Sequence, residues 1–254
     1  SEPSEKLMNQ YNEAKEIYKA YPDSIEALIW YGRRTAYLGR YNDAISIYSK
    51  GINQFPKEPR LYRHRGHRYI SIRKFDEAII DFEKASELIV GTENQIEPDG
   101  MPNARNIPVS TLHGNIYYHL GLTYYLKHDY QKAYDAYLKC RASGKLPDNI
   151  VSSTHWLYMI QRRIGNVKLA KEMLEPIQSY YDLCKVYKEI TPIDSLLQAG
   201  TGSPSNDAVS YGVANWYFYN DDKEKAKKIM QDLVESTAWS SFGYIAAESD
   251  LLHY

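Results

Sequence analysis

Ten residues at positions 60–69, RLYRHRGHRY, carry four arginines and two histidines. Side chains of these two types bind metal ions, phosphates and carboxylates. His64 and His67 offer two metal ligands at HxxH spacing, whereas zinc sites use three or four ligands in a fixed geometry. We therefore expect no metal site in this stretch. The arginines favour an anionic ligand instead, because the guanidinium group pairs well with carboxylates and phosphates.

The sequence lacks the common catalytic motifs. It contains no GxSxG, HExxH or GxxxxGK[ST] pattern. Cys140 falls at a small-residue position of a helical pattern, which favours an inert packed thiol. Glu97 and Asp99 can meet His67 or His155 only if the segment that carries the two carboxylates folds inward. We predict a non-catalytic protein with no cofactor.

Composition excludes several classes of protein. The chain has 31 basic and 32 acidic residues and a formal net charge of −1, whereas nucleic-acid-binding domains usually have a basic excess. No run of 18 or more apolar residues predicts a membrane span. The two cysteines do not form a CxxC motif. The chain begins with Ser1 rather than Met, which fits an exported protein that has lost a leader, but the compartment stays open.

Internal repetition organises the chain. Gly32 and Gly66 lie 34 residues apart, and so do Ala44 and Ala78. Each copy contains two helical patterns around a short turn. We predict a single domain made of a cap at 4–21, repeats at 25–58, 59–92, 114–147, 151–178 and 207–236, an insert at 91–111 and a closing helix at 237–252.

These units resemble tetratricopeptide repeats. That family places an aromatic residue, then Leu-Gly, then Tyr on the first helix of a repeat, and Ala, an aromatic residue and Pro on and after the second. The third copy fits best, with Tyr117, Leu120, Gly121, Tyr124, Ala133 and Tyr137. The second copy has Tyr62, Gly66, Tyr69, Ala78 and Phe82, and the first has Gly32, Ala44, Tyr48 and Pro56.

The resemblance implies an all-α fold, a right-handed superhelical stack of helix-turn-helix repeats, here with irregular C-terminal helices. It also implies a scaffold that binds a partner segment in a concave groove lined by the first helices. Family members that clamp the carboxylate terminus of chaperones use lysine, asparagine and arginine at set positions. This sequence has Ile29, Arg33, Tyr118 and Leu122 there, so that ligand is not expected.

Helical spacing identifies the residues that would face the groove. Acidic residues occur mainly on second helices and caps, so the groove is expected to be basic and rich in tyrosine. We therefore predict a scaffold that binds a protein or an acidic peptide. The candidate ligand-binding residues are Arg33, Tyr37, Arg60, Arg63, His67, Tyr118, Tyr125, His155, Arg162, Tyr211 and Asn215.

Two other hypotheses stay open. The first is a small-molecule-binding protein or enzyme whose pocket is closed by residues 91–111, and packing of that segment across the histidines and arginines would favour it. The second is a structural subunit that forms homo-oligomers through its tyrosine-rich surface. Arg65 stands where the family has leucine. Its guanidinium either pairs with an aspartate of a neighbouring helix or acts at the groove edge.

Overall fold

Helices form nearly all the regular structure of the computed structural model, which describes residues 3–98, 110–144, 146–174, 182–196 and 204–253. Within these ranges there is no strand, and one isolated bridge joins Ile96 to Thr111. The all-α class predicted from the sequence is confirmed. The helices are α1 (Glu5–Ala20), α2 (Ile25–Tyr37), α3 (Tyr41–Gln54), α4 (Pro59–Ser71), α5 (Phe75–Leu88), α6 (Leu112–Leu126), α7 (Tyr130–Ala142), α8 (Pro147–Arg163), α9 (Val167–Met173), α10 (Asp182–Tyr187), η1 (Ile193–Leu196), α11 (Pro204–Tyr219), α12 (Lys223–Val234) and α13 (Phe242–Leu251). A search of the described helices for one long and apolar enough to cross a membrane finds none.

One turn recurs between the helices of each pair. Two residues after the first helix ends, the backbone enters the left-handed region. This conformation terminates the helix and allows its last carbonyls to accept hydrogen bonds. At the end of α4, for example, the Lys74 amide donates to the Tyr69 carbonyl at 2.9 Å. Only two of the five turns use glycine, so glycine alone does not reveal the pattern. The five residues are Gly39, Arg73, His128, Gly165 and Asp221, with φ of 74°, 61°, 60°, 81° and 66°.

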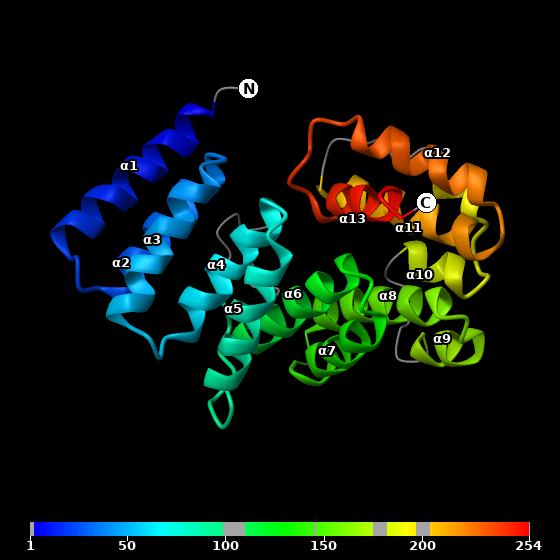
Figure 1. The fold of residues 1–254 in the computed structure, drawn as a ribbon, viewed down its shortest axis with the longest axis horizontal. Helices are drawn as coiled ribbons and strands as arrows, with labels where there is room; N and C mark the ends of the chain where they lie inside the picture. Colours follow the sequence, from blue (N-terminus) through cyan, green and yellow to red (C-terminus); the bar gives the residue numbers. More distant parts are fainter. Residues whose placement is uncertain (1–2, 99–109, 145, 175–181, 197–203, 254) are drawn as a thin grey trace. The chain divides into compact units, whose positions relative to one another are not determined.

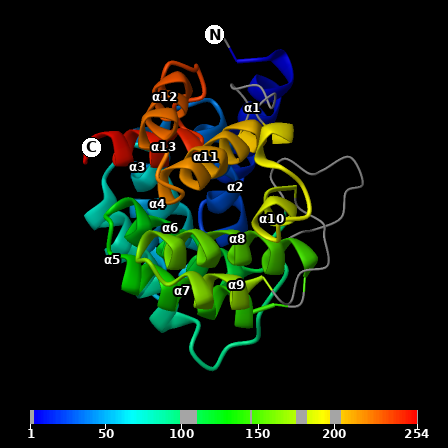
Figure 2. The same ribbon diagram turned by 90° about the vertical axis from the view of Figure 1, so that its right-hand side faces the viewer.

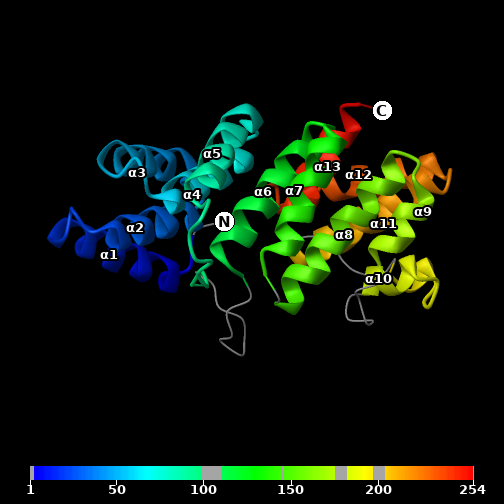
Figure 3. The same ribbon diagram turned by 90° about the horizontal axis from the view of Figure 1, so that it is seen from below.

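The chain divides into two compact units, Ser1–Thr123 and Tyr124–Tyr254. In the first unit α2 packs on α3, α4 packs on α5, and α2 also contacts α4 (Figure 3). Small residues permit the close approach within each pair. A Cβ atom on Gly32 would lie 2.5 Å from the ring of Tyr48, and one on Gly66 would lie 2.9 Å from the ring of Phe82. The glycine spacing noted in the sequence therefore marks helix crossings.

In the second unit α8 packs between α7 and α9, and α11 packs on both α12 and α13 (Figure 2). The core around Tyr158, Leu183 and Val213 joins α8, α10 and α11. A Cβ atom on Gly243 would lie 2.2 Å from the backbone carbonyl oxygen of Asp207, so α13 can approach α11 only with glycine at that position.

α1, which Ser4 caps, lies within the predicted cap at 4–21, and α13 covers Phe242–Leu251 of the predicted closing helix at 237–252. α11 begins at Pro204, a residue well suited to a first helical turn. Of the insert at 91–111, residues 99–109 lie outside the described residues, and so do residues 175–181 of the fourth repeat. The arrangement of all repeats in one domain stays a prediction.

Candidate functional site

The basic residues of α2 and α4 meet a carboxylate from the insert. Glu97 is 6% exposed, and its Oε2 lies 3.2 Å from NH2 of Arg63. The side-chain amide of Asn115 on α6 donates to the same carboxylate. The backbone amide of Glu97 donates to the Ser110 carbonyl at 3.1 Å, which ties this arm of the insert to the start of α6. Glu97 is thus a buried ion-pair partner of Arg63.

His64 completes this cluster as a neutral side chain. NH1 of Arg63 lies 2.9 Å from Nδ1 of His64, and a guanidinium can only donate, so Nδ1 must accept. The proton of His64 then lies on Nε2, which is 3.2 Å from Oε1 of Glu97. Burial, followed by the charge of Arg63, lowers the pKa of His64 well below its ordinary value. The positive charge of the cluster therefore comes from arginine.

Arg33 contacts the next residue of the insert. Its NH2 group donates to the Pro98 carbonyl at 2.9 Å, and Nε donates to the Tyr37 hydroxyl at 3.4 Å. The guanidinium also stacks over the ring of Trp30, 4.4 Å from the centroid. Residues 97 and 98 of the insert therefore pack against two of the predicted arginines, Arg33 and Arg63.

Arg68 and Tyr48 are a different case. Among the described residues the Arg68 guanidinium has no ion pair or hydrogen bond, and it lies 5.5 Å from the centroid of the Tyr41 ring. The hydroxyl of Tyr48, a residue that is 1% exposed, has no hydrogen bond in the same part of the chain. Burial raises the pKa of Tyr48, and Arg68 opposes that shift more than any other charge, so the two groups lie near each other. Burial lowers the pKa of Arg68, as expected of a cation with no counter-ion.

The remaining candidates of the first unit occupy other positions. Arg60 pairs with Glu58 at 2.8 Å and also with Glu26, so it does not present a free charge. The ring centroid of His67 lies 4.6 Å from that of His119, and Tyr118 meets His119 edge-on at 5.4 Å. In this unit the structure thus brings Arg33, Tyr37, Arg63 and His67 to one polar region.

In the second unit three candidates form a buried network instead of an open surface. Tyr125, Tyr211 and Asn215 are 2%, 1% and 0% exposed. The Tyr211 hydroxyl donates to Asp250 at 2.7 Å and lies 2.9 Å from the Tyr125 hydroxyl, while Nε of Arg163 donates to Asn215 at 2.6 Å. The sequence predicts that these side chains line a groove. They are buried instead, because their polar groups belong to the hydrogen-bond network around Asp250 of the closing helix.

His155 and Arg162, the two candidates on α8, lie outside this network. His155 is buried, with Nδ1 at 3.2 Å from the Tyr187 hydroxyl, and the two rings stack 5.9 Å apart. Arg162 donates to the Tyr219 carbonyl at 3.0 Å and borders a cavity of about 560 Å³ that Glu189 and Trp216 also line. Only Arg162 of these two candidates reaches an open space in this unit.

Neither cysteine is placed for chemistry. Burial raises the pKa of both the Cys140 and the Cys184 thiol to about 12, so each is protonated at neutral pH. Among the described residues, no group of three or more His, Cys, Asp and Glu side chains is arranged to hold a metal ion.

Comparison with known proteins identifies the fold. No family model and no curated protein matches the sequence. Among solved structures, YrrB, described as a TPR protein with an unusual peptide-binding site, aligns over 93% of this chain and 97% of its own, with a TM-score of 0.51 and 15% identity. A tetratricopeptide repeat protein from Parabacteroides merdae aligns over 98% of this chain and 80% of its own, with a TM-score of 0.54 and 14% identity. The chain has the tetratricopeptide repeat fold.

The tetratricopeptide repeat fold explains the position of Arg65, where the family has leucine. Its Nε and NH2 donate to the two carboxylate oxygens of Asp81 at 2.8 and 2.7 Å, and NH1 donates to Ser49 at 3.0 Å. Asp81 lies on α5 and Ser49 on α3, so the guanidinium links α4 to both neighbouring second helices. This confirms the structural ion pair with a neighbouring aspartate and leaves Arg65 no free charge for a ligand.

Sequence reasoning missed Arg68, Tyr48 and Asn115 as site residues within this tetratricopeptide repeat fold. Arg68 lies inside the quoted stretch but is one position beyond the face that Arg60, Arg63 and His67 define. Tyr48 matches a family packing position, and that pattern gives no sign of a role for its hydroxyl. Asn115 follows the insert directly, and only the fold of the insert shows that it reaches Glu97.

Acid is expected to destabilise both units of this tetratricopeptide repeat fold. Burial lowers the pKa of His119 and of His155 to about 3. Below the ordinary histidine pKa of about 6.5 the unfolded chain binds protons that the folded chain does not, so each histidine should reduce stability by about 1.4 kcal/mol per pH unit between pH 6 and 4. Urea unfolding at several pH values should show this, and His119→Asn should have a shallower dependence. Equal slopes for wild type and variant would contradict the assignment.

Proposed function

We propose that the chain is a non-catalytic scaffold that binds an acidic segment of a partner protein through the basic region of α2 and α4. The tetratricopeptide repeat fold supports a role in protein interaction, and the similar protein YrrB has a peptide-binding site. The observation that carries the proposal is the pair of unused donors, the Arg68 guanidinium and the Tyr48 hydroxyl. A carboxylate would satisfy both.

Charge in this region supports an anionic ligand. Three guanidinium groups, those of Arg33, Arg63 and Arg68, lie near His64, and the carboxylate of Glu97 lies 3.2 Å from the same histidine. The lowered pKa of His64, His67 and His119 keeps these three histidines neutral at pH 7. A surplus of positive charge in a partly buried region strengthens the attraction for an acidic ligand, because solvent screens it less than at an open surface.

Glu97 indicates the chemistry that this region accepts. Its carboxylate lies 3.2 Å from both Arg63 and His64 and accepts a hydrogen bond from Asn115, so the region holds one desolvated carboxylate. Arg68 has no such internal partner among the described residues. We therefore propose that one carboxylate of the ligand binds Arg68 and Tyr48. Glu97 keeps its own position beside that carboxylate.

The packing of residues 97 and 98 gives weight to a second candidate function, a small-molecule-binding protein. That hypothesis requires the insert to pack across the basic residues, and Glu97 and Pro98 do contact Arg63 and Arg33. A small dicarboxylate would then occupy the position proposed for the peptide carboxylate. The two functions differ in how affinity depends on ligand length.

The test compares Arg68→Gln with Arg60→Gln, because Arg60 loses the same charge but is already paired with Glu58. Fluorescein-labelled hexaglutamate is expected to bind wild type and Arg60→Gln alike. We expect Arg68→Gln to bind about 10- to 100-fold more weakly, the cost of losing hydrogen bonds to a charged group. Fluorescence anisotropy measures the affinities, with hexaglutamine as the neutral probe and circular dichroism as the check on folding.

Each outcome discriminates between the hypotheses. Equal affinity of hexaglutamate for wild type and Arg68→Gln would overturn the proposed site. Succinate that competes as strongly as hexaglutamate would favour the small-molecule function. Self-association through the tyrosine-rich surface stays a prediction, and a single monomer mass across concentrations in sedimentation equilibrium would contradict it.

A further inference from the structure

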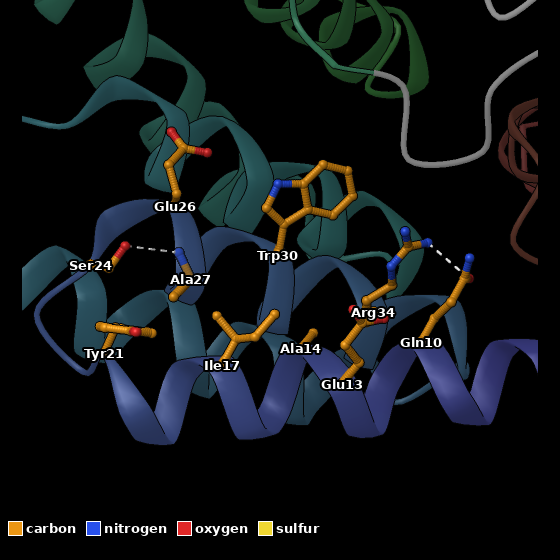
Figure 4. Close-up of a pocket in the computed structure, with 10 residues that line it drawn as sticks. All are labelled: Gln10, Glu13, Ala14, Ile17, Tyr21, Ser24, Glu26, Ala27, Trp30 and Arg34. Atoms are coloured by element: carbon orange, nitrogen blue, oxygen red, sulfur yellow. Dashed lines mark hydrogen bonds between the residues drawn. The ribbon is translucent and has the colours of Figure 1, made fainter.

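The second unit contains a cavity that the proposed function does not use. The smaller cavity of about 370 Å³ between α1 and α2 adjoins the basic region, since Trp30 lines it (Figure 4) and also stacks with the Arg33 guanidinium. The cavity of about 560 Å³ in the second unit shares no residue with that region. Side chains from α8, α9, α11 and the segment 186–193 line it.

One wall of this second cavity is built by residues that belong to no repeat. The segment 186–193 lies between the fourth and fifth predicted repeats and contains the end of α10 and the start of η1. Val186 and Ile193 are 4% and 7% exposed. The hydroxyl of Tyr217 on α11 donates to Asp194 at 3.2 Å, which holds this wall against α11. The cavity is therefore a feature of this segment and not of the repeated architecture.

Arg162 brings a positive charge to the cavity without a carboxylate to balance it. NH1 donates to the Tyr158 hydroxyl at 3.1 Å, and NH2 donates to the Tyr219 carbonyl at 3.0 Å and to Oδ1 of Asn220 at 3.2 Å. All three acceptors are neutral. The next residue, Arg163, forms a buried ion pair, whereas Arg162 has none within the described part of the chain. A guanidinium carries more N–H donors than these contacts use, so Arg162 can also donate to a ligand.

The guanidinium of Arg162 is held in place before any ligand binds. It lies over the ring of Tyr219, 4.3 Å from the centroid, and 5.9 Å from the centroid of Tyr158. The rings of Tyr158 and Tyr187 stack at 4.1 Å, and these two residues are 2% and 3% exposed. A ligand that binds a fixed donor group does not have to order that group first, which favours affinity.

The other charges at the cavity cancel each other. Nζ of Lys171 lies 3.1 Å from Oε1 of Glu189, and the two side chains are 59% and 78% exposed. Because this pair is neutral as a whole and well solvated, Arg162 sets the charge that the cavity presents. A ligand with a single negative charge complements it, and a carboxylate is the group that guanidinium geometry matches best at that charge.

The rest of the lining is mainly apolar and favours a flat ring. Ile190, Pro192 and Ile193 supply aliphatic surface, and Trp216 adds its partly buried indole from α11. The indole already meets the ring of Tyr217 edge-on at 5.2 Å. Aromatic rings pack well against such surfaces. The volume of about 560 Å³ is that of a small-molecule site, for which roughly 300–1,000 Å³ is usual.

We infer that this cavity binds an aromatic carboxylate. The carboxylate pairs with Arg162, and the ring packs against Trp216 and the apolar residues of the segment 186–193. A free small acid presents this chemistry, and so does an aromatic residue at the C-terminus of a peptide. The site lies in one unit and the basic region in the other, so the inference does not rest on the proposed function.

Isothermal titration calorimetry of the full chain with 2-naphthoate tests the site. Wild type and Lys168→Gln should bind alike, because Lys168 is exposed and does not line the cavity. Arg162→Gln should bind about 10- to 100-fold more weakly, the cost of losing hydrogen bonds to a charged group. The neutral analogue 2-naphthamide should bind wild type with a similar loss.

Ile190→Glu is a second variant that keeps the fold, because Ile190 is 61% exposed. It should also weaken 2-naphthoate binding, since it places a negative charge at the cavity. Circular dichroism checks the folding of each variant. N-acetylphenylalanine separates the two sources of the ligand. Tighter binding than 2-naphthoate would assign the cavity to a peptide C-terminus, and weaker binding would assign it to a free acid.

Four results would overturn the inference. They are no binding of either acid to wild type, equal affinity of 2-naphthoate for wild type and Arg162→Gln, equal affinity of 2-naphthoate and its amide, and competition by acetate as strong as that by 2-naphthoate. Hexaglutamate binding should be unaffected by Arg162→Gln, so this inference and the proposed function succeed or fail separately.

Discussion

Asp250→Ala is expected to lower the free energy of unfolding of the unit Tyr124–Tyr254 by about 3–5 kcal/mol, the usual cost of leaving a buried charge unpaired. The side chains of Arg163 and Asp250 are 5% and 2% exposed. The Tyr211 hydroxyl donates to the same carboxylate at 2.7 Å, and His128 lies 3.4 Å from it. Removal of the carboxylate would leave the buried Arg163 guanidinium without its counter-ion, with Asn215 as its remaining acceptor, and would leave the Tyr211 hydroxyl only the Tyr125 hydroxyl as a partner.

Urea unfolding followed by tryptophan fluorescence measures this effect. Trp156, Trp216 and Trp239 all belong to this unit, so a Trp30→Phe background reports on it alone. Asp232→Ala is the control, because Asp232 pairs with Lys228 at the surface and exposed pairs contribute about 0–1 kcal/mol. A loss for Asp250→Ala no larger than that of Asp232→Ala would show that the buried network contributes little.

Glu97→Ala is expected to destabilise the unit Ser1–Thr123 by a similar amount, about 3–5 kcal/mol. Arg63 is 11% exposed and would lose its only carboxylate among the described residues, and Asn115 would lose an acceptor. Hydrogen exchange of peptides from α4 and the start of α6 should accelerate, because both helices contact Glu97 through these side chains.

A rescue experiment tests whether the charge itself is responsible. Acetate at high concentration should partly restore protection in Glu97→Ala by occupying the vacated position, whereas chloride at equal ionic strength should not. Glu87→Ala provides the control, since Glu87 is paired with Lys84 at the surface. Unchanged exchange of α4 in Glu97→Ala would contradict the structural importance of the pair.

The fold was predictable because it rests on local and repeated features. The 34-residue spacing of Gly32 and Gly66 reports a packing requirement that the structure shows directly, namely contact of each glycine with the aromatic ring of its pair. Helical periodicity likewise placed α1 and α13. Such signals need no knowledge of distant contacts.

The candidate site was predictable only in part, because partner choice depends on distant segments. Spacing along one helix grouped Arg60 with Arg63, but Glu58 and Glu26 pair with Arg60 while the insert supplies Glu97 to Arg63. Tyr211 and Asn215 face the core since Asp250 and Arg163 meet them there. A helical wheel shows which face a residue occupies but not what covers that face.

The position of the insert has a consequence for protein engineering. Glu97 enters the basic region from a connection between two repeats, after α5 ends and before α6 begins. The helix crossings at Gly32 and Gly66 do not depend on that connection. Replacing Glu97 would therefore change the charge that the region presents to a ligand and, through Arg63 and Asn115, the stability of α4 and α6 as well. The connection couples ligand selectivity to the stability of the scaffold, so an engineered segment must keep an acceptor for Arg63 and Asn115.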